Sequence, residues 1–321
     1  MITSTNRAQH RYAQLSKACA RAIGTHMHSA KLAAATAVAI LLSVGCSSDQ
    51  PITPERYSPS DSLLQQLKSN VAANGQWREV AEIDHSRLGQ EAGSTMPPSR
   101  VLIFSVPSLE ASLIQHNPLV ALDLPPRVLA YEDTSDGVSK LIYNDYDYIQ
   151  TRYDLPEKSD LQSDYEQAMS AAVAGVPQGQ IGSFDQFNME GDGIITIDSP
   201  FGFAETMQRV LDAIASQDDT VSFGTVDFQQ QAAEQGIEVP PNSLILFGAP
   251  GPGARAMSGA PTLGLDAFCQ KLLVWQDSNG DVKLSFNDLL AIAERQGVGG
   301  SIPLRVISYR LNKVFSEALE N

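Results

Sequence analysis

Two stretches of this 321-residue chain decide its fold: EIDHSRLGQEAGSTMPPSRVLIFSVP at Glu82–Pro107 and TVDFQQQAAEQGIEVPPNSLILFGAP at Thr225–Pro250. They align without a gap at a separation of 143 residues, and both place a Pro-Pro pair before an apolar run that leads to a further proline. Because matches at one fixed separation are the signature of an internal repeat, the sequence predicts two copies of one domain.

The same separation extends beyond the two stretches. It pairs Asp123 with Asp266 and Asn144 with Asn287. Each copy has about 125 residues, which is enough for a domain to bury a core of its own. The predicted organisation is a signal peptide at 1–45, a first repeat at 46–175, a linker at 176–193 and a second repeat at 194–321.

Within each repeat, short apolar runs alternate with amphipathic segments. In the second repeat, Ile194–Asp198 and Val221–Asp227 are predicted strands, and apolar residues at helical spacing between Phe203 and Ile214 predict a helix. Leu289–Gln296 and Leu304–Leu319 are predicted to close the repeat as helices. The opening segment of the first repeat, PITPERYS, lacks the apolar run of its counterpart. We therefore expect an α+β fold, in which each repeat is a two-layer domain with a hairpin-containing mixed sheet.

One segment, QDSNGDVKLSFNDLLAI at 276–292, resembles the calcium loop of an EF-hand. Its sixth position, where the loop needs Gly, is Val282, and its twelfth, where the loop needs a bidentate Glu, is Asp288. The preceding run KLLVW is typical of a strand, and the matching segment of the first repeat does not keep the ligand positions. We therefore interpret both segments as β-hairpins and expect no calcium site.

Two further stretches invite a binding interpretation. NMEGDGIITIDS at 188–199 lacks a twelfth carboxylate, so we interpret it as linker followed by a strand, with a weak cation site as the alternative. FGAPGPGARAM at 247–257 is rich enough in glycine to surround an anion. Its prolines provide no N–H donors, so we expect a plain loop there.

The start of the chain is typical of a targeting segment. The first 45 residues carry five basic residues and no acidic one. The apolar run Leu32–Val44 is too short for a bilayer, which takes about 20 residues, but it suits a signal peptide. Met27 offers an alternative start that gives a signal of ordinary length.

The end of this segment resembles the lipobox of bacterial lipoproteins. Gly45 precedes Cys46, and a polar run follows, although Ser43 stands where that motif prefers Leu. The resemblance implies cleavage before Cys46 and a lipid on this cysteine. Because Ser47 rather than Asp follows it, the resemblance also implies an anchor in the outer membrane, with the body in the periplasm. A signal that is neither cleaved nor lipidated is the alternative.

Composition excludes several functional classes. The chain has a net charge of −15, and without its basic first 45 residues the body carries −20, which should repel nucleic acid and anionic lipid. Beyond the signal and Cys46, the chain contains Cys269, His85 and His116, too few for a disulfide or a Cys/His zinc set. The common motifs of hydrolases, nucleotide-binding loops and metalloproteases are absent. We therefore expect no cofactor, no metal and no nucleic-acid partner.

Three stretches of the first repeat point to a known family. IDHSRLGQEAGSTMPPSRVLIFSVP, NPLVALDLPPRVLAYED and LIYND resemble the domain-of-unknown-function family numbered 302. The resemblance covers almost the whole chain after the signal peptide, and it implies a compact α/β domain without a settled activity. Relatives with one domain pair as dimers, so the resemblance also implies that the two repeats pack as an intrachain pseudo-dimer.

The polar residues that match this family are the candidate ligand-binding residues: Asp84, His85, Asp123, Asn144 and Asp145. A histidine beside carboxylates can act as a general base or bind a cation. The second repeat keeps the four other residues but has Phe228 in place of the histidine, which favours roles in helix caps and turns. We expect a lipid-anchored binding or structural module of the cell envelope. The alternative is an enzyme or metal-binding protein with its site around His85 and a degenerate second repeat.

Overall fold

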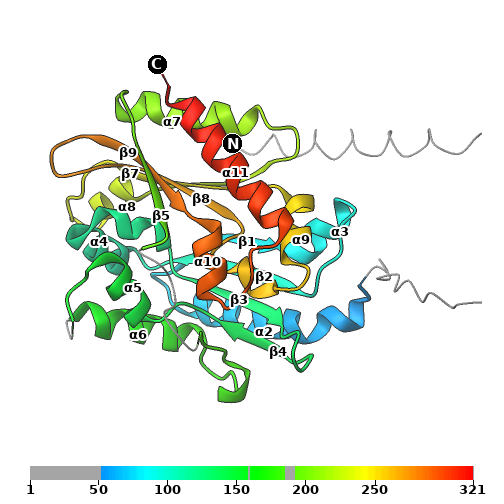
Figure 1. The fold of residues 1–321 in the computed structure, drawn as a ribbon. Coiled ribbons are helices and arrows are strands. Elements are labelled where there is room, and N and C mark those ends of the chain that lie inside the picture. Colours follow the sequence, from blue (N-terminus) through cyan, green and yellow to red (C-terminus); the bar gives the residue numbers. More distant parts are fainter. Residues whose placement is uncertain (1–51, 158–159, 185–191, 321) are drawn as a thin grey trace, which may run out of the picture. The chain divides into compact units, whose positions relative to one another are not determined.

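The first repeat is built on a four-stranded antiparallel sheet with the strand order β1-β2-β3-β4 (Figure 1). The structure is a computed structural model that describes residues 52–157, 160–184 and 192–320. Helix α2 contacts all four strands, and α6 packs against α2. The elements of this repeat and the linker are α2 (Pro54–Ala73), β1 (Arg78–Asp84), α3 (His85–Glu91), β2 (Ser99–Ser105), α4 (Pro107–His116), η1 (Pro118–Asp123), β3 (Arg127–Glu132), β4 (Ser139–Ile142), α5 (Tyr146–Tyr153), α6 (Asp160–Ala172) and η2 (Gln178–Gln180).

The second repeat is built on a five-stranded antiparallel sheet with the order β5-β9-β8-β7-β6, in which β5 forms an edge beside β9 (Figure 1). The predicted opening strand and both closing helices are confirmed to within two residues. The elements of this repeat are β5 (Ile194–Asp198), α7 (Phe203–Ala215), β6 (Val221–Asp227), α8 (Phe228–Glu234), β7 (Asn242–Gly248), α9 (Pro250–Met257), η3 (Pro261–Gly264), β8 (Gln270–Gln276), β9 (Val282–Asn287), α10 (Leu289–Arg295) and α11 (Ile302–Ala318).

The two sheets share their strand order and their irregularities, which confirms the predicted duplication and the α+β class. Strands β6 to β9 repeat the order of β1 to β4. The β1–β2 register shifts between Glu79 and Ala81, and the β6–β7 register shifts between Ser222 and Gly224, 143 residues later. Asp84 caps α3 by accepting the N–H of Arg87, and its counterpart Asp227 caps α8 in the same way. A shared bulge and a shared cap are local features that two unrelated domains would not have in common.

The first repeat has no counterpart of β5 within its described residues. In the second repeat, Ile197 of β5 pairs with Leu284 of β9. In the first repeat the equivalent of Leu284 is Leu141, which forms a parallel bridge with Ile181 of the linker. The opening segment becomes the start of α2, because Pro54 suits the first turn of a helix and no apolar run competes for the sheet edge.

The Gly- and Pro-rich stretch predicted as a loop is helix α9, and that prediction was wrong. Pro250 occupies the first turn, where its missing N–H costs nothing. The glycines weaken the helix, but small residues let α9 pack closely on α3. A Cβ atom placed on Gly89 would lie 2.3 Å from the Cβ of Ala254. Packing at this close approach therefore outweighs helix propensity.

The segment that resembles an EF-hand loop is a hairpin turn, as interpreted. It is preceded by strand β8 and followed by strand β9, which pair antiparallel. The Asp277 side chain accepts the N–H groups of Asn279 and Asp281, at 2.9 and 3.0 Å. The carboxylate thus stabilises the turn. The stretch NMEGDGIITIDS at 188–199 lies partly outside the described residues, and its later part forms β5 as predicted.

The repeats contact one another reciprocally. Helix α3 contacts α9, and α4 contacts α8, as Figure 1 shows for the first of these pairs. Since α8 is the equivalent of α3 and α9 the equivalent of α4, each contact has a repeat-related counterpart. The turn η1 packs against β7 and β8, and η3 packs against β2 and β3, which extends the same relation. No helix of the described ranges is long and apolar enough to cross a membrane.

Candidate functional site

The structure gives Asp84 and His85 separate roles near the start of α3. Asp84 caps the helix and also binds the guanidinium of Arg87 at 2.5 Å. His85 is buried, and its Nε2 lies 3.1 Å from the carbonyl oxygen of Gly264 in the other repeat. A carbonyl only accepts, so Nε2 carries the proton and donates. Burial lowers the pKa of His85 to about 4, so the ring is neutral at pH 7.

Asp123 belongs to a different group, which we call the inter-repeat ion cluster. Its carboxylate accepts hydrogen bonds from Arg127, from Arg152 at 2.7 Å and from the Tyr153 hydroxyl at 2.8 Å. His85 is not among its hydrogen-bond partners in the described ranges, so the two predicted residues do not form one site. The members of the inter-repeat ion cluster are Asp123, Arg127, Asn144, Arg152, Asp266, Asn287 and Arg295.

The second carboxylate of the cluster comes from the other repeat. Asp266 is the repeat equivalent of Asp123, and it accepts from Arg127 at 2.6 Å and from Arg295 at 3.0 Å. Predicted residue Asn144 also donates to Asp266, at 2.9 Å. Arg127 therefore bridges the two carboxylates, one from each repeat.

Reciprocal bonds join the repeats around this bridge. Arg152 of the first repeat donates to Asn287 Oδ1 of the second at 2.8 Å. Its equivalent, Arg295, donates to Asn144 Oδ1 of the first repeat, also at 2.8 Å. The cluster thus has near two-fold symmetry, which Arg127 breaks because the second repeat has Gln270 at the equivalent position.

The cluster is almost fully withdrawn from water. The side chains of Asp123 and Asp266 are 0% exposed, and those of Arg127 and Arg295 are 3% and 4% exposed. Burial by itself would raise the pKa of both carboxyls, but the neighbouring guanidiniums outweigh it and hold the pKa of each below its ordinary value. Both carboxylates are therefore ionised at pH 7.

Positive charge exceeds negative charge in this region. Three guanidiniums of the cluster face two carboxylates. Lys271 is buried beside them and donates to the Asp266 carbonyl oxygen at 2.9 Å. Burial and the nearby Arg127 lower the pKa of Lys271 to about 8, so most of its charge remains at pH 7. An anionic group close to the cluster would therefore be stabilised.

Predicted residue Asp145 lies at a pocket beside the cluster. It caps α5 by accepting the N–H of Tyr148, and it is exposed. The pocket has a volume of about 370 Å³, and Arg295 of the cluster forms part of its lining. We call it the Arg295 pocket. Its lining also includes Tyr143, Asp147, Tyr148, Thr151 and Phe184.

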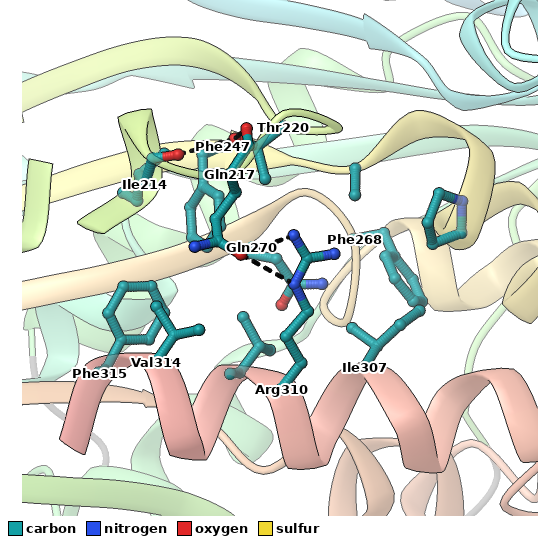
Figure 2. A pocket seen from close by; sticks show the side chains of 13 residues that line it. Ile214, Gln217, Thr220, Phe247, Phe268, Gln270, Ile307, Arg310, Val314 and Phe315 are labelled. Carbon is teal, nitrogen blue, oxygen red and sulfur yellow. Dashed lines mark hydrogen bonds between the residues drawn. The ribbon is translucent and has the colours of Figure 1, made fainter. Parts of the chain in front are cut away.

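Each repeat also has a pocket formed by equivalent residues. Figure 2 shows the one in the second repeat, where Phe247, Phe268 and Phe315 give apolar walls and Arg310 of α11 reaches across to Gln217. Arg310 also binds Asp219 at 2.6 Å. The free volume is about 40 Å³, well below that of ordinary ligand sites, about 300–1,000 Å³.

The equivalent pocket of the first repeat is larger, at about 350 Å³. The equivalent of Arg310 there is Gln167, and Trp77, Ser108 and Asp164 also line the space. The first repeat thus lacks the arginine that crosses the pocket of the second repeat, and its pocket is larger and more polar. The described lining of this pocket includes no charged group comparable to the buried Arg295, so the Arg295 pocket is the stronger candidate for ligand binding.

Sequence reasoning missed the three arginines of the cluster. Arg152 and Arg295 lie 143 residues apart, so extending the alignment past Asn144 and Asn287 would have found them. Arg127 has no arginine counterpart and leaves no such signal.

Comparison with known proteins gives a family and partial relatives. The family model described as "Domain of unknown function DUF302" matches residues 54–176 and 195–317. "Fluoride-specific ion channel FluC 1" of Brucella suis biovar 1 (strain 1330) is 37% identical over 107 residues, which are 33% of this chain and 41% of that protein. The protein of the same name from Brucella abortus biovar 1 (strain 9-941) is 37% identical over 107 residues and is matched over 39% of its length.

The chain therefore spans about two fifths of the length of these curated relatives. Among solved structures, an uncharacterized conserved DUF302 protein from Bacillus stearothermophilus is similar, with a TM-score of 0.33 and 20% identity. That match covers 40% of this chain and 95% of the other.

Proposed function

Because this chain belongs to the DUF302 family and contains two tandem copies of its domain, we propose that it is a lipid-anchored binding module of the bacterial cell envelope. In this proposal the two repeats act as one body, packed as a fused pseudo-dimer. The observation that carries the proposal is the inter-repeat ion cluster. It contains charges from both repeats, and separating the repeats would break the buried Arg127–Asp266 ion pair and the reciprocal bonds of Arg152 and Arg295 to asparagines of the other repeat, at a cost of several kcal/mol.

The geometry of Asp123, Asp266 and His85 favours a structural role over catalysis. A general acid or base needs access to substrate. The carboxylates of Asp123 and Asp266 are 0% exposed and already bonded to guanidiniums. His85 is neutral, buried and bonded to a backbone carbonyl. These side chains therefore suit a scaffold that holds a binding surface in place.

The anchor rests on the signal-like segment and on Cys46, which lie outside the described residues. The first described residue, Ile52, follows Cys46 by six positions, and six extended residues span about 20 Å. A lipid on Cys46 would thus hold the body close to the membrane surface. The Brucella relatives are named as fluoride channels, and the likeness covers 41% or less of their length.

Metabolic labelling with an alkyne fatty acid tests the anchor. The wild-type chain should take up the label and sediment with outer membranes. Cys46→Ser should lose the label and leave the membrane fraction, or accumulate as the uncleaved precursor. Cys269→Ser is the matched control, because Cys269 is a buried free thiol and not the predicted lipid site. A wild-type chain that fractionates as unlabelled soluble periplasmic protein would contradict the proposal.

A further inference from the structure

Two equivalent arginines in the ion cluster differ in how many of their donors are used. A guanidinium has five N–H donors. Arg152 makes five hydrogen bonds, to the carbonyl oxygens of Asp192 and Gly193 and to the side chains of Asp123, Tyr148 and Asn287. Its equivalent Arg295 makes two in the described part of the chain, to Asp266 and Asn144.

The difference arises from what lies against each guanidinium. Residues 192 and 193, which lead into β5, place their carbonyl oxygens 2.8 and 3.2 Å from Arg152. Arg295 instead lines the pocket of about 370 Å³. Its side chain is 4% exposed, so water reaches little of it except through that opening. The donors of Arg295 that bond neither Asp266 nor Asn144 are therefore open to an acceptor that enters the pocket. A ligand with acceptor oxygens could bind Arg295 there without displacing either of its protein partners.

The aromatic lining fixes the orientation of this guanidinium. Its central carbon lies 3.5 Å from the ring centroid of Tyr148 and 4.5 Å from that of Phe184. Both contacts are cation–π interactions, and they come from α5 and from the linker. A planar guanidinium held in this way suits a planar carboxylate, which it can bind with two parallel hydrogen bonds. The excess of positive charge in the cluster favours the same anionic group.

Two exposed carboxylates of the opposite charge also line the pocket. They belong to Asp145 and Asp147. The carboxylates would repel a simple anion on its way to Arg295, but they would attract a cationic group attached to it. A molecule with a carboxylate at one end and an ammonium group near it satisfies both parts of the site. The volume falls in the range of ordinary ligand sites, about 300–1,000 Å³.

We propose that the Arg295 pocket is the ligand site of this module and that it takes a small zwitterion of the α-amino acid class. The carboxylate of the ligand binds Arg295, and its ammonium group lies toward Asp145 and Asp147. The inference rests on the proposed function as a binding module, and it names the class of ligand.

Isothermal calorimetry on the full-length chain in detergent tests the ligand class. The probes are L-alanine, L-phenylalanine and glycylglycine, with sodium acetate and methylammonium chloride as the two halves of the ligand. At least one zwitterion should bind saturably with a Kd at least tenfold lower than that of either half. Absence of saturable binding by all three zwitterions would overturn the proposal. Acetate binding as tightly as the zwitterions would overturn it in favour of a simple anion site.

Variants in the pocket lining locate the site without disturbing the ion cluster. Thr151 is exposed and lines the pocket, so Thr151→Trp should fill it and weaken binding at least tenfold with an unchanged Tm. Glu294→Trp, at the exposed equivalent position of the second repeat, is the matched control and should bind as wild type. Asp147→Asn should reduce the preference for the zwitterion over acetate. Equal binding by the two Trp variants would place the ligand elsewhere and contradict the proposal.

These outcomes separate the ligand from the anchor. A chain that is lipid-labelled but binds no zwitterion overturns the inference about the Arg295 pocket and leaves the anchor intact. A chain that binds a zwitterion but carries no lipid overturns the anchor alone.

Discussion

Replacing Arg127 by Gln removes the bridge between the two buried carboxylates. Gln is the residue that the second repeat carries at the equivalent position 270, so the substitution makes the two repeats alike there. Arg127 contacts Asp123 and Asp266, and it also donates to the carbonyl oxygens of Leu265 and Asp123, each at 2.8 Å. All of these contacts are lost or weakened in the variant.

The expected cost is near the lower end of the range for a broken buried ion pair, which is about 3–5 kcal/mol. Asp123 keeps Arg152 and Tyr153, and Asp266 keeps Arg295, so neither carboxylate is left without a partner. We therefore expect Arg127→Gln to lower the free energy of unfolding by about 3 kcal/mol at pH 7.

The cost should depend on pH. In the wild type, the guanidiniums hold the pKa of both carboxyls below the ordinary value. Without Arg127 the pKa of at least one carboxyl rises, so the folded variant takes up a proton at mildly acidic pH, where the unfolded chain takes up fewer. The difference in stability between wild type and variant should therefore shrink as pH falls from 7 toward 4.

Urea denaturation followed by fluorescence measures this cost. The two tryptophans, Trp77 and Trp275, report one on each repeat. Lys313→Gln is the control, because Lys313 forms an exposed pair with Glu317 and should change stability by less than about 0.5 kcal/mol. A loss below about 1 kcal/mol for Arg127→Gln, a typical value for an ordinary substitution, would refute the role given to the cluster. So would a loss that does not change with pH.

Three further predictions concern single side chains. Burial lowers the pKa of His85 to about 4, so the unfolded chain binds more protons than the folded one between pH 4 and 6.5. The free energy of unfolding should therefore fall by up to about 3 kcal/mol as pH drops through this window. A His85→Gln variant that loses as much stability as the wild type over the same window, in urea titrations, would contradict this. Burial raises the pKa of Glu110 to about 7, so the protonated side chain contributes to stability at pH 4.5 and this contribution is lost as pH rises through 7. In thermal melts, a shift from pH 5 to 8 should therefore lower the Tm of Glu110→Gln less than that of the wild type. Asp277→Ala should cost about 1 kcal/mol through lost turn hydrogen bonds, and a cost that grows when millimolar calcium is present would revive the calcium loop.

The duplication could be predicted because both copies keep the residues that set local geometry. Asp84 and Asp227 cap equivalent helices, and Pro107 and Pro250 begin the next ones. Such residues leave matched letters at a fixed separation. Helix α9 was missed because PGPGARAM has low helix propensity, and the close packing of Ala254 on Gly89 that stabilises it is a contact between distant residues.

The candidate site was only partly predictable, for a related reason. Asp123 and Asn144 were found because their counterparts match them, and the structure places both in the ion cluster. His85 matched the family pattern as well but lies against Gly264, apart from the cluster's hydrogen bonds. Arg127 and the pocket at Arg295 depend on what differs between the repeats, and an argument from repeat identity does not detect differences.

Cutting the chain between the repeats tests whether they form one body through the buried ion cluster. A protease site inserted within residues 185–191 allows the purified chain to be cleaved, and sedimentation velocity in detergent-free buffer on the Cys46→Ser form then gives the size of the products. We expect one particle with the mass of the uncut protein at micromolar concentration, and two separate pieces when Arg127→Gln is added in mild urea. Two folded, independent pieces from the cleaved wild-type sequence in buffer alone would contradict the claim.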